Sequence, residues 1–569
     1  MSVGSPSHGA RTYQLRERLH DELLQDLLLA RGVFPELQDV FLNPDFERDS
    51  HDPFLLPDME VAVDRLVLAR KNNELVCVWS DYDCDGIPGG VMLAEFLRSV
   101  GFRIRHYIPH RHKEGYGLNL EGLKQIKEEG VSLVVTVDLG ITDVEPVAYA
   151  NSLGLEVIIS DHHLVHMQTD KKGKVKQILP PALAVVNPKR IDSKYPFDGL
   201  CGAGVAWKIA QAVLARDRFG LAEGQEKWLL DLVGLATVAD RMPLLGENRM
   251  LAHYGLLVMR RARRPGLAAL LSQMRTKPGN LTEDDIGFMI APRINAASRM
   301  DEPELAARLL GTVDREEAKS LAKELEGLNT QRKVLVATTV KEVNKRMHES
   351  GNEASVIVMG SPSWRPGILG LVATSLVESH GKPVFLWGRE GGQMLRGSCR
   401  SDGSVNVVEL MQGAREVFDD FGGHFASGGF SLLQERAHEL QMSLVRSYET
   451  LNASTSAIAP TVLERELVLP EVAHAHRVLK QLAPFGEANK KPLFLFPKTN
   501  VSRVRTFGKA NDHLELTLMH EDTYVGGIAF FSTQESFTKP VESGSRVDVV
   551  GHVETDWRGS PRIRIIDII

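Results

Sequence analysis

The sequence predicts an α/β fold in several parts: a parallel-sheet domain, a long connecting helix, a second α/β domain and a C-terminal β-barrel. Three patterns predict it. Apolar runs alternate with helical patterns in the first half, a charged helical stretch follows from residue 314, and short strand-like runs fill the region after residue 461. We expect limits at 1–50 for an N-terminal helical segment, then 51–312, 313–350, 351–450 and 460–569 for these four parts.

The composition is that of a globular protein, with 569 residues, 43% hydrophobic and 25% charged. Its net charge of −7 gives no support to a nucleic-acid partner, so any basic surface must be local. Four cysteines without a C-x-x-C pair indicate a reducing compartment. Because no long uncharged apolar run appears, we expect a soluble cytoplasmic protein with no membrane contact.

Two helical patterns precede the first strand, at residues 13–32 and 59–72. Residues 75–78 then form an apolar run, and Asp81, Asp83 and Asp85 follow it before a helical pattern at 91–100. In an extended segment these carboxylates would point to one side and repel one another unless a cation lay between them. Hard oxygen ligands suit Mg²⁺ or Mn²⁺. Taken alone, the pattern is more often an acidic turn at a strand end.

The pattern recurs downstream. The apolar run 133–137 ends in Asp138, the run 157–159 is followed by Asp161, His162 and His163, and the run 235–239 ends in Asp240. A helical connector at 147–153 separates the first two, as in a parallel sheet. Ligands gather outside the carboxyl ends of parallel strands, so these residues predict a site with two Mn²⁺ or Mg²⁺ ions.

These motifs resemble those of the DHH phosphoesterases, a family named after its third motif. Within it the chain looks like the RecJ branch, single-strand-specific 5′→3′ DNA exonucleases. The motifs that carry the resemblance are Asp81–Gly86, Val137-Asp138, Asp161-His162-His163 and Val238-Ala239-Asp240, with Glu114-Gly115-Tyr116-Gly117-Leu118, Gly246-Glu247-Asn248-Arg249 and Pro292-Arg293-Ile294-Asn295-Ala296-Ala297. Shorter matches continue to the C-terminus.

The resemblance implies the roles of these residues. Two ions would be held by Asp81, Asp83, Asp138, His162 and Asp240, with Asp138 as the bridge, and these residues together with His163 would be catalytic. His163 would contact the scissile phosphate or support an ion. Asp85 and Asp161 would orient ligands and helix amides.

The resemblance also implies a substrate and partners. The chain would release 5′-mononucleotides from single-stranded DNA in mismatch repair, base excision repair and end resection. It would act as a monomer, with a single-strand-binding protein and a helicase as partners. Arg111, Ser398 and Arg400 would converge on the 5′-terminal phosphate, because an arginine fork grips phosphate oxygens. Arg293, Arg299 and His424 are further substrate-binding candidates, although His424 is by its chemistry equally well structural.

The second half restarts an α/β pattern after the charged helix at 314–349. Strands are expected at 354–359 and 382–387, with a helix at 370–379, and residues 422–428 match the signature of the DHH-associated domain. A Ser/Thr/Ala-rich linker at 451–460 precedes strand-like runs at 493–496, 501–507, 513–518, 524–531, 547–553 and 562–569.

These runs predict a small barrel, and the resemblance makes it an OB-fold. Candidate contacts for single-stranded bases are Arg503, Arg505, Lys509, Phe530, Phe531, Trp557 and Arg558. Alternatively, the aromatic residues fill the barrel. Because the metal motifs all lie upstream, removal of residues from 461 onward is expected to weaken DNA binding more than it slows the chemistry.

Two alternatives remain within the same family. One is an oligonucleotide or cyclic-dinucleotide phosphodiesterase, a class that lacks the C-terminal barrel. The other is a non-catalytic relative that takes part in replication and has lost metal ligands. The length of the chain argues against the first alternative, and its complete ligand set argues against the second.

Overall fold

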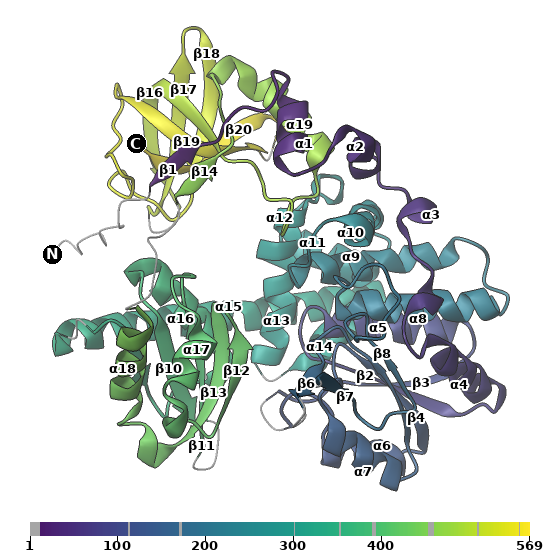
Figure 1. Cartoon of the computed structure of the whole chain (residues 1–569). Coiled ribbons are helices and arrows are strands. Elements are labelled where there is room, and N and C mark those ends of the chain that lie inside the picture. The colour runs from purple at the N-terminus through teal and green to yellow at the C-terminus, as the bar shows by residue number, and fades with distance from the viewer. Residues whose placement is uncertain are drawn as a thin grey trace. The chain divides into compact units, whose positions relative to one another are not determined.

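The computed structural model describes residues 12–111, 114–169, 173, 175–300, 302–351, 354–389, 394–452, 460–508, 511–556 and 558–569 (Figure 1). The chain forms two compact units. One comprises Asp39–Arg332 together with Pro484–Lys490 and, because the motifs predicted to be catalytic lie in it, is called the catalytic unit below. The other comprises the described residues up to Gln38, Lys333–Ala483 and Lys491–Ile569.

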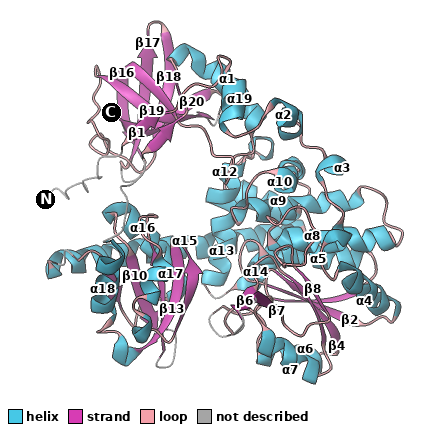
Figure 2. Ribbon diagram, in the orientation of Figure 1, coloured by secondary structure: helices cyan, strands magenta, loops and turns pink. Residues whose placement is uncertain are grey.

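The catalytic unit is built on a five-stranded sheet in the order β3–β2–β4–β5–β8, and every neighbouring pair is parallel, as predicted. The strands are β2 (Leu75–Ser80), β3 (Arg103–Tyr107), β4 (Val131–Val137), β5 (Glu156–Ser160) and β8 (Ala184–Val186). Helices cover both faces (Figure 2): α6 (Leu120–Glu128) and α7 (Val144–Ser152) lie on one, and α5 (Gly86–Ser99) and α8 (Gly202–Arg216) on the other.

The central strands β2 and β4 are largely apolar because both of their faces are buried, whereas the edge strand β3 is more polar and more exposed. Along β2, Val76 and Val78 pack into the core beneath α5 and α8. The alternate residues Cys77 and Trp79 pack into a second core with Leu123 of α6. The first three acidic motifs directly follow the ends of β2, β4 and β5, so this sheet positions them.

The remaining elements of the catalytic unit are mostly helices that extend the larger core. They are α3 (Phe46–Asp49), α4 (Met59–Lys71), α9 (Leu230–Ala239), α10 (Gly246–Met259), α11 (Pro265–Gln273), α12 (Glu283–Asp285), α13 (Ala291–Arg299) and α14 (Pro303–Gly311), with a hairpin of β6 (His166–Thr169) and β7 (Val175–Ile178). Helix α2 (Pro35–Leu42) and the 36-residue α15 (Arg315–Ser350) each begin in one unit and end in the other. The predicted long helix is thus confirmed.

The second α/β part has a five-stranded sheet in the order β12–β13–β11–β10–β9. Its elements are β9 (Ile357–Gly360), α16 (Pro366–His380), β10 (Val384–Arg389), β11 (Met394–Arg400), α17 (Val407–Gln412), β12 (Asp420–His424), β13 (Ser427–Leu433) and α18 (Leu440–Asn452). Helix α16 starts four residues earlier than predicted, because Pro366 is suited to the first helical turn. The glycine-rich signature forms the β12–β13 hairpin, where Gly423 faces Gly428.

The C-terminal strands close into a barrel, as predicted, because β16 pairs with both β17 and β19. They are β16 (Phe494–Phe507), β17 (His513–His520), β18 (Thr523–Ala529), β19 (Arg546–Thr555) and β20 (Pro561–Ile568), preceded by β15 (Arg465–Glu466) and α19 (Val472–Leu482). The runs predicted as separate strands at 493–496 and 501–507 are one strand, whose pairing with β19 shifts register between Phe496 and Thr499.

The N-terminal prediction is partly wrong. Residues 13–32 do not form one helix: β1 (Tyr13–Leu15) pairs in parallel with β14 (Thr461–Leu463), and only α1 (Leu23–Ala30) is helical. The leucine spacing indicated a helix, but the long-range partner of β1 is not visible in local sequence. Asp26, buried in α1, pairs with Arg16 at 2.9 Å, and Arg16 also reaches Glu464 at 2.9 Å. None of the described helices has the length and apolarity needed to span a membrane.

Candidate metal centre

The first acidic motif turns sharply after β2 and does not run on as an extended segment. The Oδ1 atom of Asp83 accepts hydrogen bonds from the backbone amides of Asp85 (2.8 Å) and Gly86 (3.1 Å), and so caps the start of α5. The prediction that simple alternation places the three carboxylates on one side is therefore wrong. Asp85 binds the backbone amides of Gly202 (2.6 Å) and Ala203 (2.8 Å) at the start of α8. These bonds match its predicted role of orienting helix amides.

Asp138 follows β4 in the left-handed backbone conformation, with φ of 65°. This conformation costs a non-glycine residue about 1–3 kcal/mol and is found mostly at functional sites. Its amide donates to the carbonyl of Ser160 at the end of β5. Gly202 fits closely against it, because a Cβ there would lie 2.4 Å from the Cβ of Asp138. The small residues at the start of α8 thus provide room for the carboxylate.

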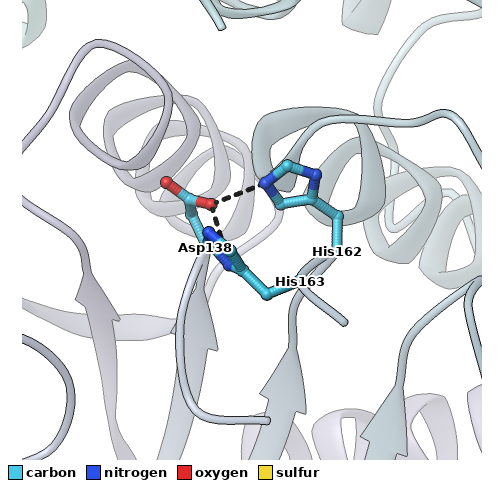
Figure 3. Close-up of side chains that lie close together, drawn as sticks. All are labelled: Asp138, His162 and His163. Carbon is cyan, nitrogen blue, oxygen red and sulfur yellow. Dashed lines mark ion pairs between the residues drawn. The ribbon is translucent and has the colours of Figure 1, made fainter. Parts of the chain in front are cut away.

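The third motif places two imidazoles beside Asp138 (Figure 3). The Oδ1 atom of Asp138 lies 3.2 Å from Nε2 of His162 and 3.8 Å from Nδ1 of His163. Asp161 orients both histidines: its Oδ1 accepts from their amides and lies 2.8 Å from Nδ1 of His163. Its Oδ2 accepts from the amide of Ile141 at 2.9 Å. Asp161 therefore has the orienting contacts expected of it.

Asp240 does not end a strand, and this prediction is wrong. The run 230–239 is helix α9, and Asp240 is the residue that follows its last turn. A short apolar run fits either structure, and here burial on all sides favours a helix in the larger core. The carboxylate nevertheless reaches the other motifs, because its Oδ2 lies 3.6 Å from Nε2 of His162.

The candidate ligand atoms form three overlapping groups, within each of which all atoms lie within 4.8 Å of one another. These groups are Asp81, Asp83 and Asp138; Asp138, His162 and His163; and Asp85, His162 and Asp240. One oxygen each of Asp81, Asp138 and Asp240 is buried and accepts no hydrogen bond from any described residue. Buried oxygens normally have partners, so this donor set fits divalent cations such as Mn²⁺ or Mg²⁺.

Electrostatics in the metal-free chain supports the same conclusion. Burial and the negative charge of Asp83 raise the pKa of Asp81 well above its usual value, and burial with Asp85 raises that of Asp240 to about 8. Burial and the nearby His163 lower the pKa of His162 to about 3, so its imidazole is neutral. Burial opposes protonation of His163, but the hydrogen bond and charge of Asp161 outweigh it and raise the pKa to about 9.

Two residues of the sequence motifs gain contacts that the sequence did not predict. The hydroxyl of Tyr116 lies 3.3 Å from the carbonyl of Asp138 and 3.5 Å from Nδ1 of His163. Asn295 accepts a hydrogen bond from the amide of Cys84 at 2.9 Å, which fixes the turn between Asp83 and Asp85. Both residues belong to motifs on which the family resemblance rests, and that membership was the sign in the sequence that they lie near the site.

The predicted arginines of the catalytic unit differ in their surroundings. The guanidinium of Arg111 lies over the ring of Tyr82, 4.9 Å from its centre. The nearby acidic residue Glu114 accepts a hydrogen bond from the Tyr107 hydroxyl at 2.6 Å. Arg293 is buried and pairs with Glu326 at 2.5 Å, while Arg299 is half-buried at the end of α13.

Ser398 and Arg400 lie together in the other unit. They are alternate residues of β11, and both face Gly370 of α16: a Cβ on that glycine would lie 2.8 Å from Nη2 of Arg400 and 3.7 Å from the hydroxyl of Ser398. His424 is exposed at the end of β12.

The barrel carries an exposed aromatic group at the end of β18. Phe530 and Phe531 are 39% and 81% exposed, and each ring contacts that of His513, at centroid distances of 5.7 and 4.8 Å. The alternative that these two residues fill the barrel is therefore wrong. Arg503 and Arg505 are exposed on β16, and Arg558 is exposed before β20. Lys509 and Trp557 lie outside the described residues.

Three family models match successive parts of the chain. They are the DHH family N-terminal domain at residues 75–237, the DHHA1 domain at 353–448 and the RecJ OB domain at 471–566. The single-stranded-DNA-specific exonuclease RecJ of Bacillus subtilis is 33% identical, over 97% of this chain and 69% of that protein. RecJ of Dickeya dadantii is 30% identical, over 96% of this chain and 95% of that protein. The chain belongs to the RecJ family.

Solved RecJ structures agree with this assignment. RecJ of Thermus thermophilus in complex with Mn²⁺ superposes with a TM-score of 0.75 at 28% identity, covering 96% of this chain and 76% of that one. The same protein has also been solved with Mg²⁺, with a TM-score of 0.71 at 26% identity, covering 98% of this chain and 78% of that one. The match to the RecJ OB domain covers the C-terminal barrel.

Proposed function

We propose that this RecJ-family chain is a metal-dependent exonuclease that hydrolyses single-stranded DNA from its 5′ end and releases 5′-mononucleotides, in DNA repair and recombination. The observation that carries the proposal is the buried group of carboxylates beside His162, in which three oxygens have no hydrogen-bond donor among the described residues. Curated relatives across most of the chain are named single-stranded-DNA-specific exonucleases.

Asp81, Asp83, Asp138, His162 and Asp240 would hold two Mn²⁺ or Mg²⁺ ions, and both Asp138 and His162 belong to two of the three groups. When bound, such ions supply Lewis acidity and neutralise charge at the phosphate. The protein prepares this chemistry in advance. The oxygens of Asp85 accept hydrogen bonds from backbone amides, and those of Asp161 contact a backbone amide and His163. These contacts keep the ligands in place, and the two carboxylates do not compete for the ions.

His163 is suited to a different task. Its imidazole is held by Asp161, carries a proton at neutral pH in the metal-free chain, and is 44% exposed. A cationic ring that is oriented and open to solvent can donate a hydrogen bond to a phosphate oxygen and stabilise the charge that develops there. We assign His163 to the scissile phosphate, as a catalytic residue beside the ligands.

The 5′-terminal phosphate is assigned to Arg111, Ser398 and Arg400. Ser398 and Arg400 present a hydroxyl and a guanidinium side by side near the start of α16, a combination suited to phosphate oxygens. Arg293, Arg299 and His424 are proposed as further substrate contacts. Phe530 and Phe531 would stack on bases. We further propose a cytoplasmic monomer that works beside a single-strand-binding protein and a helicase.

The test is degradation of single-stranded DNA labelled at either end, with Mn²⁺ or Mg²⁺, alongside a duplex of the same sequence. We expect early release of the 5′ label as mononucleotide from the single strand. We expect no hydrolysis of the blunt duplex, and none of the single strand when a chelator is present. Hydrolysis confined to dinucleotides or cyclic dinucleotides would assign the chain to a different DHH activity. Binding without hydrolysis at any metal concentration would make it a non-catalytic relative.

A further inference from the structure

A seven-residue loop from the C-terminal half of the chain packs within the catalytic unit. Pro484–Lys490 belongs to this unit, although its neighbours in the chain, α19 and β16, belong to the other. The carbonyl of Glu487 accepts a hydrogen bond from the amide of Leu244 at 2.8 Å, and the carbonyl of Pro484 accepts one from Arg249 at 3.3 Å. Leu244 lies only four residues after Asp240.

The loop has its own internal bonds. The side-chain amide of Asn489 donates to the carbonyl of Pro484 at 2.8 Å, and the amide of Gly486 donates to the carbonyl of Asn489 at 3.0 Å. Asn489 and Phe485 are buried, and Ala488 holds a left-handed conformation with φ of 60°. A short loop with closed hydrogen bonds and buried ends is a rigid surface for another segment to rest on.

The segment that rests on it carries Asp240. After helix α9, Arg241 has φ of 57°, and the amide of Met242 donates back to the carbonyl of Thr237 at 3.2 Å. The turn is therefore fixed at its start by α9 and at its end by the bond from Leu244 to the loop. Contact is close, because a Cβ on Gly486 would lie 2.8 Å from Cδ1 of Leu244.

We propose that Pro484–Lys490 is a positioning element for Asp240, and thus that the metal centre depends on residues almost 250 positions downstream of its last ligand. The inference rests on the proposed function, in which Asp240 binds an ion. It also changes the expectation for truncation. Removing residues from 461 onward removes this loop with the barrel, so the chemistry is weakened together with DNA binding.

The test uses the full chain with Gly486→Ala and Gly486→Val, which press progressively harder on Leu244, and Asn489→Ala, which opens the loop. The control is Gly279→Val, the same substitution at an exposed glycine of the catalytic unit where a Cβ would meet nothing within 4 Å. Mn²⁺ binding is measured by calorimetry, kcat and KM on single-stranded DNA by end-label release, and folding by thermal unfolding.

We expect Gly486→Val to bind at least one Mn²⁺ about tenfold more weakly and to lose kcat by a similar factor, with KM for DNA changed less than threefold. Gly486→Ala lies between wild type and Gly486→Val, Asn489→Ala binds Mn²⁺ more weakly than wild type, and Gly279→Val matches wild type. Unchanged Mn²⁺ affinity in both Gly486→Val and Asn489→Ala would overturn the proposal. The proposal would also be overturned if Mn²⁺ affinity and kcat fell only in variants with a lower unfolding temperature, and in proportion to that decrease. If wild type bound Mn²⁺ but degraded no DNA, the proposed function would fail, while the binding data would still decide the role of the loop.

Discussion

At the scale of single residues, Asp138 is under several constraints at once. Its backbone is left-handed, its carboxylate lies between two imidazoles, and Gly202 leaves no space behind it. Burial and the charges of Asp85 and Asp83 raise its pKa well above the usual value. If Asp138 binds a cation as proposed, that binding would offset the free energy that this strained and buried carboxylate costs the folded chain.

We therefore expect Asp138→Ala and His162→Ala to lower kcat by roughly 10³-fold or more, because each removes a ligand that places charge at the phosphate. The folded state should survive, since Asp138→Ala removes a source of repulsion. End-label release and thermal unfolding measure the two effects. His253→Ala, at a half-buried histidine of α10, is the control. Near wild-type turnover in Asp138→Ala would refute the site assignment.

The raised pKa values predict that metal binding releases protons. Below pH 8 Asp240 carries a proton in the metal-free chain, and that proton must leave before the carboxylate can bind an ion. Mn²⁺ affinity should thus fall as pH falls, by up to about tenfold per unit for each proton displaced. His162, with a pKa of about 3, contributes no proton above pH 5. Calorimetry at pH 7 in buffers of different ionisation enthalpy counts the protons, and a count of zero would contradict the prediction.

The close packing of Gly202 in α8 against Asp138 leads to a prediction. In Gly202→Ala the new methyl group would overlap Asp138, so either the ligand or the helix must move, and we expect kcat to fall about 10²-fold. Gly204→Ala, two residues along the same helix, is the matched control, because a Cβ there has only ordinary contacts, the nearest at 3.4 Å. Turnover is compared at saturating Mn²⁺ and DNA. If both substitutions lowered kcat equally, the cause would be the loss of a glycine in α8 and not the crowding of Asp138.

At the scale of elements, periodicity predicted much of the fold and of the site. The strands β2, β4 and β5 and the residues after them were predictable, because buried parallel strands leave continuous apolar runs. Asp240 was placed on the wrong kind of element, since a short buried helix leaves the same apolar run as a strand. Strand β1 and the contacts of Pro484–Lys490 were missed because their partners lie hundreds of residues away.

The end of β18 should contribute to DNA affinity. Phe531→Ala is expected to weaken binding of single-stranded DNA by about 1–3 kcal/mol, roughly 5- to 150-fold, because it removes an exposed stacking surface. The value of kcat at saturating DNA should not change. Fluorescence anisotropy measures the affinity, and Tyr524→Ala, at a 63% exposed aromatic residue at the other end of β18, is the control. Unchanged affinity in Phe531→Ala would remove this group from the DNA-binding surface.

At the scale of the whole molecule, the proposed polarity of digestion leads to a prediction about the 5′-terminal phosphate. We expect wild type to degrade DNA with a 5′-phosphate faster than DNA with a 5′-hydroxyl, and Arg400→Ala to reduce that preference by roughly 10- to 100-fold, the value of one or two charge-assisted hydrogen bonds. Arg446→Ala, at an exposed arginine of α18, controls for lost positive charge. Equal wild-type rates on both substrates would remove the phosphate contact, and release of 3′ label first would remove the polarity as well.

The pairing of β1 with β14 has a consequence for synthesis of the chain. Tyr13–Leu15 is among the first described segments to leave the ribosome, yet its partner Thr461–Leu463 is translated almost 450 residues later. At about 5–20 residues per second, the strand waits roughly 20–90 s for its hydrogen bonds. During that interval the carboxylate of Asp26 can pair with Arg16 but not with Arg465, whose guanidinium lies 3.8 Å from it in the folded protein. Strand β1 is therefore synthesised long before it can reach its final structure, and its backbone remains unpaired with β14 during that interval.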